Sequence, residues 1–197
     1  MSKYKSVPFK SLPVGATYSR PVTKWPEGLT ADSPAIDVMT DLRKVTALTV
    51  ERTTTLSATR ERMKKLGVRM QLVTGATAAV MGVITLTDLD SGRAEKIASK
   101  TGEDAAFLQV QHVMTLTGRI EVMTLESVKN AKIGDILTSF NETERRHALV
   151  LNSNTESGQD EICGIFSLTV ICKLIGLDVA PGDPMEKVKT QLASILK

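Results

Sequence analysis

The segment Gly82–Asp88 (GVITLTD) places a hydroxyl and a carboxylate where they could hold a nucleotide. A short apolar run ends at Thr85, and Asp88 follows three positions later, so the two side chains occupy the N-cap and N3 positions of the helix predicted there. In one interpretation they only cap this helix, which stabilises it by about 1 kcal/mol. In the other, the helix N-terminus faces a phosphate and the Asp88 carboxylate accepts hydrogen bonds from both hydroxyls of a ribose.

A second stretch, Gly164–Val170 (GIFSLTV), repeats this pattern with one change. Ser167 keeps the hydroxyl, but Val170 stands where the carboxylate would be. Because valine cannot accept a hydrogen bond, ribose hydroxyls placed beside it would lose their partners. We therefore expect an asymmetric protein with at most one ribose site, formed by Thr85 and Asp88.

Further matches indicate that the chain from residue 34 onward contains two copies of one unit. Val38–Thr40 returns as Val113–Thr115, and Arg69–Val73 returns as Arg146–Val150. The spacing between the copies grows only in loops, as expected for a duplicated unit of about 75 residues. Each unit is predicted to fold as strand, helix, strand, strand, helix.

Apolar periodicity predicts where these elements lie. The expected strands are residues 45–50, 69–73 and 79–84 in the first unit and 147–151 and 162–166 in the second. The expected helices are residues 55–66, a helix that starts after Thr85 and continues past Asp90, and a helix with Ile133, Ile136, Leu137 and Phe140 on its apolar face.

These motifs resemble the CBS domain, named after cystathionine β-synthase. GVITLTD, preceded by VMTD (38–41) and GVRMQLV (67–73), is similar to one CBS domain, and the VMT, RHALV and GIFSLTV segments of the second unit are similar to another. The resemblance covers residues 34–176 and implies a Bateman module, an α/β (α+β) fold of two pseudo-symmetric repeats. Such modules commonly pair with a second module and often bind adenosine nucleotides in the clefts between repeats.

The chain then divides into five parts: an extended basic arm (1–33), a first CBS domain (34–92), a linker helix region (93–107), a second CBS domain (108–176) and a C-terminal amphipathic helix (177–197).

The resemblance also implies which residues hold the ligand: Thr85, Asp88, Arg69, Met70, Arg146, His147 and Ser167. In the family, the Ser/Thr-x-x-Asp pair contacts ribose and phosphate. Arg69 and Arg146 stand where the family often has a basic residue, and each guanidinium either grips a phosphate or is an exposed group at a strand start. His147 either contacts the base or phosphate or is merely tolerated at the strand edge.

Composition excludes several classes of protein. Hydrophobic residues make up 42% of the chain, so a mainly disordered protein is excluded. No segment approaches the ~20 apolar residues of a membrane span, and no apolar region follows the first lysines as in a secretory signal. Cys163 and Cys172 lack metal-ligand spacing, so we expect buried, reduced thiols in a cytoplasmic protein. No catalytic motif is recognisable, which argues against an enzyme.

The first part of the chain differs from the rest. It carries five basic residues before the first acidic one, Glu27, together with four prolines and four of the seven aromatic residues. The prolines predict an extended arm, and the aromatic residues predict that part of it docks on the body. Since the remainder has a small excess of acidic residues, a nucleic-acid partner is disfavoured. Deletion of residues 1–30 is expected to change the melting temperature by only a few degrees.

The last segment has the features of a helix start. Asp183 is expected at the N-cap, with Pro184 at N1 and Glu186 at N3. Met185, Val188, Leu192 and Ile195 then form an apolar seam, which packs either on the chain's own module or on a partner.

The leading hypothesis is a cytoplasmic regulatory module that senses AMP, ADP, ATP or S-adenosylmethionine and acts on an unidentified protein. It is expected to form a homodimer through apolar helical faces that include Leu56 with Met63 and Ile136 with Phe140. The alternative is a degenerate scaffold without ligand binding, which Val170 favours.

Overall fold

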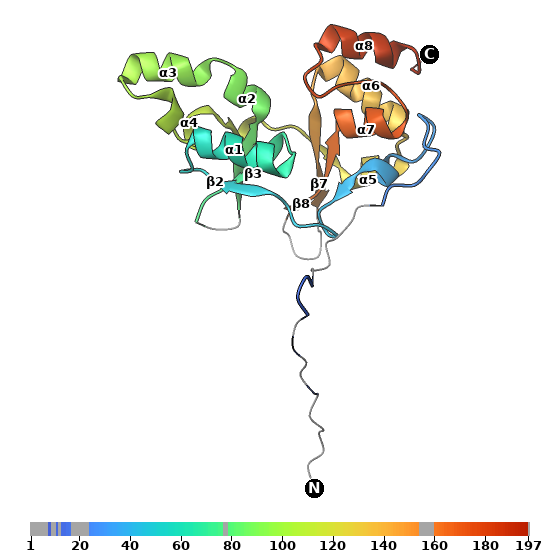
Figure 1. Ribbon diagram of the computed structural model, residues 1–197. Coiled ribbons are helices and arrows are strands. Elements are labelled where there is room, and N and C mark those ends of the chain that lie inside the picture. Colours follow the sequence, from blue (N-terminus) through green and yellow to red (C-terminus); the bar gives the residue numbers. More distant parts are fainter. Residues whose placement is uncertain are drawn as a thin grey trace.

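The computed structural model describes residues 8, 11, 13–16, 24–76, 79–153 and 160–196. These residues form two α/β halves that lie side by side (Figure 1). Each half contains a four-stranded sheet. Within the described residues, no helix is long and apolar enough to cross a membrane.

The first sheet has the strand order β2-β3-β4-β5. Its strands are β2 (Thr49–Glu51), β3 (Met70–Thr74), β4 (Val80–Thr85) and β5 (Thr115–Leu116). The parallel strands β2 and β3 are joined through α1 (Leu56–Leu66), whereas β3 and β4 form an antiparallel hairpin. The hairpin strands confirm the predicted ones to within one residue. The first predicted strand is confirmed only at its end, because β2 begins at Thr49.

The second sheet has the order β1-β8-β7-β6. Its strands are β1 (Thr40–Asp41), β8 (Asp160–Ser167), β7 (His147–Ser153) and β6 (Val122–Thr124). The parallel pair β6 and β7 is connected by α5 (Leu125–Asn130) and α6 (Ile133–Thr143). The predicted β7–β8 hairpin is confirmed, with both strands longer than expected. The three-residue strand β6 is the first strand expected in the second unit, but its position was not predicted, because so short a segment shows no periodicity.

The two halves exchange edge strands. β1 lies at the start of the first repeat but pairs with β8 of the second sheet, and β5 lies at the start of the second repeat but pairs with β4 of the first. Gly164 lies opposite β1 and Gly82 opposite β5. A Cβ atom at Gly82 would overlap the Thr115 carbonyl oxygen, and one at Gly164 would overlap the Met39 side chain. The repeated glycine of the two motifs is therefore required by the close approach of the exchanged segments.

Three hydrophobic clusters hold the fold together. Two of them lie between a sheet and its own helices and contain Val73 with Ile84 in the first half and Val150 with Phe166 in the second. The third joins the sheets to each other, and its buried members are Leu72, Val83 and Leu149. Because neighbouring strand residues alternate between faces, each hairpin contributes to a helix-facing cluster and to the inter-sheet cluster.

The helical faces expected to form a dimer interface are internal. Leu56 and Met63 of α1 are 6% and 1% exposed within the first helix-facing cluster. Ile136 and Phe140 of α6 are equally buried in the second. The prediction that these residues contact a second module is wrong, because the sheet of their own chain already covers them.

The helix after Thr85 is shorter than predicted. α2 (Leu86–Asp90) stops where Gly92 adopts a left-handed φ of 70°, and α3 (Arg93–Thr101) begins there. Glycine tolerates this conformation without strain, so it ends one helix and starts another. The remaining elements are η1 (Ala35–Val38), η2 (Ala105–Phe107), α4 (Val110–Val113), η3 (Thr117–Arg119), α7 (Leu168–Leu174) and α8 (Met185–Ala193).

The segment that begins at Trp25 and the C-terminal helix both pack on the second half. Trp25 contacts its core and Leu29 is 8% exposed within it, so the expected docking of the arm is confirmed for these residues. The other aromatic residues of the arm lie outside the described residues. A deletion through residue 30 would remove two core contacts, so the expectation of an almost unchanged melting temperature does not fit this packing.

The apolar seam of α8 packs on its own module. Val188 and Leu192 are fully buried in the second core, which decides between the two alternatives for this helix. The expected N-cap is wrong, because Pro184 occupies that position and Asp183 lies one residue before it. The Asp183 carboxylate instead accepts a hydrogen bond from the Ala180 N–H.

Candidate functional site

A cleft between the repeats contains most of the polar residues of the first motif. This Asp88 cleft, with a volume of about 570 Å³, is lined by Thr85 and Asp88 from the first repeat. Its other wall comes from the second repeat and contains Arg146, His147 and Leu149. Neither repeat alone forms this cleft, so its chemistry depends on the packing of the two sheets.

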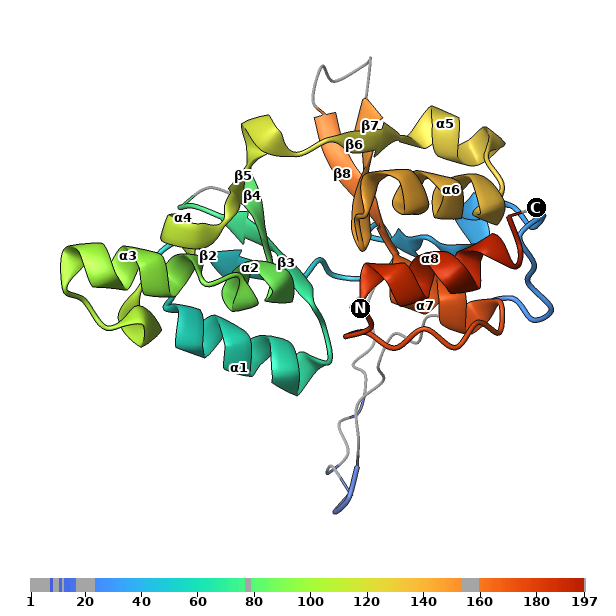
Figure 2. The same ribbon diagram turned by 90° about the horizontal axis from the view of Figure 1, so that it is seen from above.

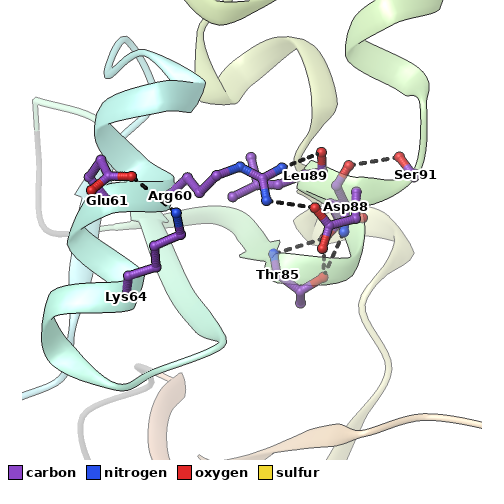
Figure 3. Close-up of polar contacts among 8 residues, drawn as sticks. Arg60, Glu61, Lys64, Thr85, Asp88, Leu89 and Ser91 are labelled. Carbon is purple, nitrogen blue, oxygen red and sulfur yellow. Dashed lines mark hydrogen bonds and ion pairs between the residues drawn. The ribbon is translucent and has the colours of Figure 1, made fainter. Parts of the chain in front are cut away.

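Thr85 and Asp88 form the predicted capping box at the start of α2 (Figure 3). The Thr85 N–H donates to Asp88 Oδ2 at 2.9 Å, and the Asp88 N–H donates to Thr85 Oγ1 at 3.1 Å. The Thr85 hydroxyl also lies 2.6 Å from Asp88 Oδ2. The other oxygen, Oδ1, has an ion pair with Arg93 Nη1 at the longer distance of 3.6 Å. Asp88 thus uses one oxygen for the cap and retains acceptor capacity on the other.

Helix α1 holds α2 in place. Arg60 Nη2 donates to the Leu89 carbonyl at 2.8 Å (Figure 3). Arg60 Nη1 pairs with Asp90 Oδ1 at 2.6 Å. Leu89 is itself buried in the first core. The turn that carries Thr85 and Asp88 is therefore anchored by the packing of Leu89 and by the hydrogen bond to its carbonyl, whereas the solvent-exposed Arg60–Asp90 pair adds little.

The opposite wall carries the Arg146 guanidinium. Arg146 Nη2 donates to the Asp183 carbonyl, and Arg146 Nη1 is buried without a hydrogen-bond partner in the structure. Burial and the nearby charges of Arg146 and Arg69 lower the pKa of His147 to about 4. His147 is consequently neutral at pH 7, and the positive charge beside it belongs to the arginines.

In a second cleft, with a volume of about 350 Å³, the two repeats exchange roles, so that the second repeat supplies the start of the helix and the first supplies the arginine. This cleft combines Ser167 and Val170 of the second repeat with Arg69 and Met70 of the first. Ser167 makes no side-chain capping bond to α7, and Val170 stands in the cleft wall where Asp88 stands in the other cleft. This Val170 cleft has no carboxylate among its lining residues.

Comparison with known proteins identifies the architecture. No protein-family model and no curated protein matches the sequence. Solved structures do match. An uncharacterized conserved protein from Pyrococcus horikoshii shares 19% identity, with a TM-score of 0.53 over 78% of this chain and 100% of that one. A protein with CBS domains from Burkholderia ambifaria shares 16% identity, with a TM-score of 0.50 over 70% and 89%. This chain has the fold of a CBS-domain pair.

A third match is a CBS-domain pair solved with adenosine-containing ligands. The pair of protein MJ0100, in complex with 5′-methylthioadenosine and S-adenosyl-L-methionine, has 11% identity and a TM-score of 0.50 over 73% of this chain and 100% of that one. The resemblance of the two sequence motifs to CBS domains is thus matched by the α+β fold.

The residues predicted to hold the ligand divide between the two clefts. Thr85, Asp88 and Arg146 line the Asp88 cleft, whereas Arg69 and Ser167 line the other, and Met70 and His147 line both. The main chain of Arg69 stays within its own repeat, because its carbonyl accepts a hydrogen bond from the Leu86 N–H. Its side chain points to the other repeat and donates to the Pro181 carbonyl at 2.9 Å. Arg69 belongs to the same repeat as Thr85 and Asp88, but its guanidinium lies in the other cleft, and the sequence did not reveal this separation.

Sequence reasoning missed several charged residues of the Asp88 cleft. Arg119, Glu121, Glu144 and Arg145 also line it. Arg145 pairs with Glu121, and Glu144 pairs with Lys189 at 2.6 Å. The run Glu144–Arg146 before β7 was the available signal, but only its last residue has a counterpart in the first repeat. In the described part of the chain, no group of histidine, cysteine or acidic residues could hold a metal ion.

Proposed function

We propose that this protein is a regulatory module that senses an adenosine-containing nucleotide in the Asp88 cleft. The supporting observation is that one cleft of about 570 Å³ is lined both by the Thr85–Asp88 pair and by Arg146 from the other repeat. Its volume lies within the range typical of small-molecule sites. The MJ0100 pair, solved with 5′-methylthioadenosine and S-adenosyl-L-methionine, supports the choice of an adenosine-containing ligand.

Each part of the nucleotide has a partner of suitable chemistry. Asp88 Oδ1 accepts the ribose hydroxyls, and the unpartnered Arg146 Nη1 donates to a phosphate or carboxylate. The base contacts the apolar side chains of the cleft, which are Met70, Val83, Ile120, Leu149 and Met185. Neutral His147 offers a ring face or a hydrogen bond without adding charge.

The proposal includes a homodimer that acts on another protein in the cytoplasm. Since the apolar faces of α1 and α6 are internal, the contact must use other side chains, and the described residues expose Leu66, Phe107, Leu116 and Val122. The two buried thiols fit a reducing compartment, and burial raises the pKa of Cys172 to about 11. Light scattering should give about twice the 21.3 kDa chain mass, and a monomer at micromolar concentration would contradict the dimer.

Calorimetry with AMP, ADP, ATP and S-adenosylmethionine tests the sensing role directly. At least one of them should bind the wild-type protein and the Asp90→Ala variant alike. Asp90 is the matched control, because it is an acidic residue of α2 that pairs with Arg60 and does not line the cleft. Absence of binding by all four would contradict the proposal.

A ligand-free scaffold is the second candidate. The closed capping box supports it, because Thr85 and Asp88 satisfy each other and stabilise α2 without any ligand. Native mass spectrometry separates the candidates, since a sensor purified from cells should retain a nucleotide-sized adduct and a scaffold should not.

A further inference from the structure

The chain between α7 and α8 contacts side chains of both repeats. It is anchored at both ends, because Val179 is 7% exposed and Val188 is fully buried in the second core. Between these anchors, residues 180–184 leave the core, and we call this segment the strap. In Figure 2 the chain before α8 extends toward the end of α1 in the other half. Pro181 accordingly lines the Val170 cleft together with Gly67 and Arg69.

The strap binds Arg69 and Arg146, the two arginines for which phosphate binding was one of the two interpretations of the sequence. Arg69 Nη1 donates to the Pro181 carbonyl at 2.9 Å, and Arg146 Nη2 donates to the Asp183 carbonyl. Arg69 belongs to the first repeat and Arg146 to the second. The strap therefore connects the two repeats through the very groups that an anionic ligand would need.

The strap has a preformed conformation. The Asp183 carboxylate accepts from the Ala180 N–H at 2.7 Å, and the Asp183 N–H donates to the Ala180 carbonyl at 3.1 Å. Lys187 Nζ donates to the same carboxylate at 3.0 Å, and this bond holds the pKa of Asp183 below its usual value. A single side chain thus closes the turn that presents the two carbonyls.

The arginines are held by weak acceptors. Both carbonyls are neutral, and the ion pairs of the described residues include neither Arg69 nor Arg146. A hydrogen bond with one ionised group is already about twice as strong as a neutral one. A phosphate, however, also brings an opposite charge and can accept two parallel hydrogen bonds from one guanidinium, which a carbonyl of the strap cannot do. An anion in the clefts would therefore bind these guanidinium groups more strongly than the strap does.

We propose that the strap competes with an anionic ligand for Arg146 at the Asp88 cleft and for Arg69 at the Val170 cleft, so that an anion bound at either arginine releases residues 180–184. At Arg146 the two compete because a two-pronged grip on the anion needs Nη2 as well as Nη1. The identity of the ligand as a nucleotide rests on the proposed function, whereas the competition itself requires only a phosphate-like anion. Release breaks the Arg69–Pro181 link between the repeats and changes the surface in front of α8. Residues 180–184 are thus the segment whose release would signal to a partner protein that a ligand is bound.

Variants of Asp183 test the strap, because this residue closes the turn but does not line either cleft. Asp183→Ala removes the closure, whereas Asp183→Asn keeps an oxygen for the Ala180 N–H and removes the same charge. Asp178→Ala is a further charge control at an exposed position of the same connection. By calorimetry, Asp183→Ala should bind inorganic pyrophosphate about fivefold or more tightly than either control. Equal affinities for Asp183→Ala and Asp183→Asn would overturn the proposal.

Hydrogen exchange of the wild-type chain provides the direct readout. Saturating pyrophosphate should accelerate exchange of the strap amides and leave those of β7 unchanged, and an unchanged strap would refute the competition. ATP binding by the wild type and by Asp88→Ala distinguishes failure of the competition from failure of the nucleotide-sensing proposal. If ATP binds no more tightly than pyrophosphate, and its affinity is the same in Asp88→Ala as in the wild type, the nucleotide-sensing proposal is wrong. A response of the strap to pyrophosphate would still support the competition. If neither probe binds the wild type or Asp183→Ala, both proposals are wrong.

Discussion

Substitution of Asp88 should separate ligand binding from helix capping, because the two carboxylate oxygens have different partners. Oδ2 accepts from the Thr85 N–H at 2.9 Å and from its hydroxyl at 2.6 Å, whereas Oδ1 has only the 3.6 Å ion pair with Arg93 among the described residues. In Asp88→Asn the amide oxygen can take the place of Oδ2. The amide nitrogen then replaces the oxygen that would accept ribose hydroxyls, so the cap remains and the ligand contact is lost.

The expected magnitudes follow from these contacts. Two charge-assisted hydrogen bonds to ribose are worth roughly 1.5–3 kcal/mol each, so both variants should weaken nucleotide binding about a hundredfold or more. Asp88→Ala also removes the capping box and its favourable charge in the first turn, which should lower the free energy of unfolding by about 1–2 kcal/mol. Asp88→Asn should lower it by less than half of that.

Calorimetry with ATP and urea denaturation measure the two quantities on the same preparations. Asp90→Ala controls for loss of an acidic residue from α2 and should retain wild-type affinity. Wild-type affinity in Asp88→Asn would refute the reasoning about ribose, and Thr85 with Asp88 would then be a structural cap. Equal stability losses in Asp88→Asn and Asp88→Ala would refute the assignment of Oδ2 to the cap.

Four further outcomes are expected. Val170→Asp should leave binding at the Asp88 cleft intact, and calorimetry should show at most one additional weak nucleotide site. Because the pKa of His147 falls from 6.5 to about 4 on folding, the unfolded chain takes up the proton first as pH falls, so stability is lost below about pH 6.5. Between pH 7 and pH 5 this loss should be about 2 kcal/mol in urea denaturation, and His147→Gln should remove it. Gly82→Ala should destabilise by about 2 kcal/mol or more, since its methyl group meets a backbone carbonyl, and an unchanged melt would contradict the strand exchange. Deletion of residues 1–23 should leave the melting temperature within a few degrees, whereas deletion of 1–30 should lower it clearly in calorimetric scans.

Local patterns predicted the local structure. The period of apolar residues placed α1 within one residue, and the Thr-x-x-Asp spacing predicted the capping box that begins α2. Both depend on contacts over three or four residues, which the sequence displays directly. The repeated motifs predicted the two β-hairpins for the same reason. The break between α2 and α3 at Gly92 was missed, because helical periodicity continues across it.

Comparison of the two motifs predicted the difference between the clefts. Asp88 and Val170 occupy equivalent positions in the repeats, and each lines the cleft that its own helix begins. This inference needed no tertiary information, because duplicated units fold alike and a substituted residue keeps its place in the fold.

Only the tertiary structure decided which residues meet across the repeats. The exchange of β1 and β5 pairs segments more than 30 residues apart, and the requirement for Gly82 and Gly164 becomes visible only in those pairs. Dimer faces could not be told from core faces by periodicity, because both are apolar stripes on a helix.

The final distribution of charge was likewise a tertiary outcome. The sequence by itself determined the two repeats, their hairpins and the single Thr-x-x-Asp pair, since these follow from local spacing. The side chain of Arg69 lies in the Val170 cleft, although its repeat supplies Thr85 and Asp88 to the other cleft. The turn closed by Asp183 binds both Arg69 and Arg146. Such contacts join residues separated by 37 and 112 positions, and their geometry depends on how the sheets pack rather than on any local pattern.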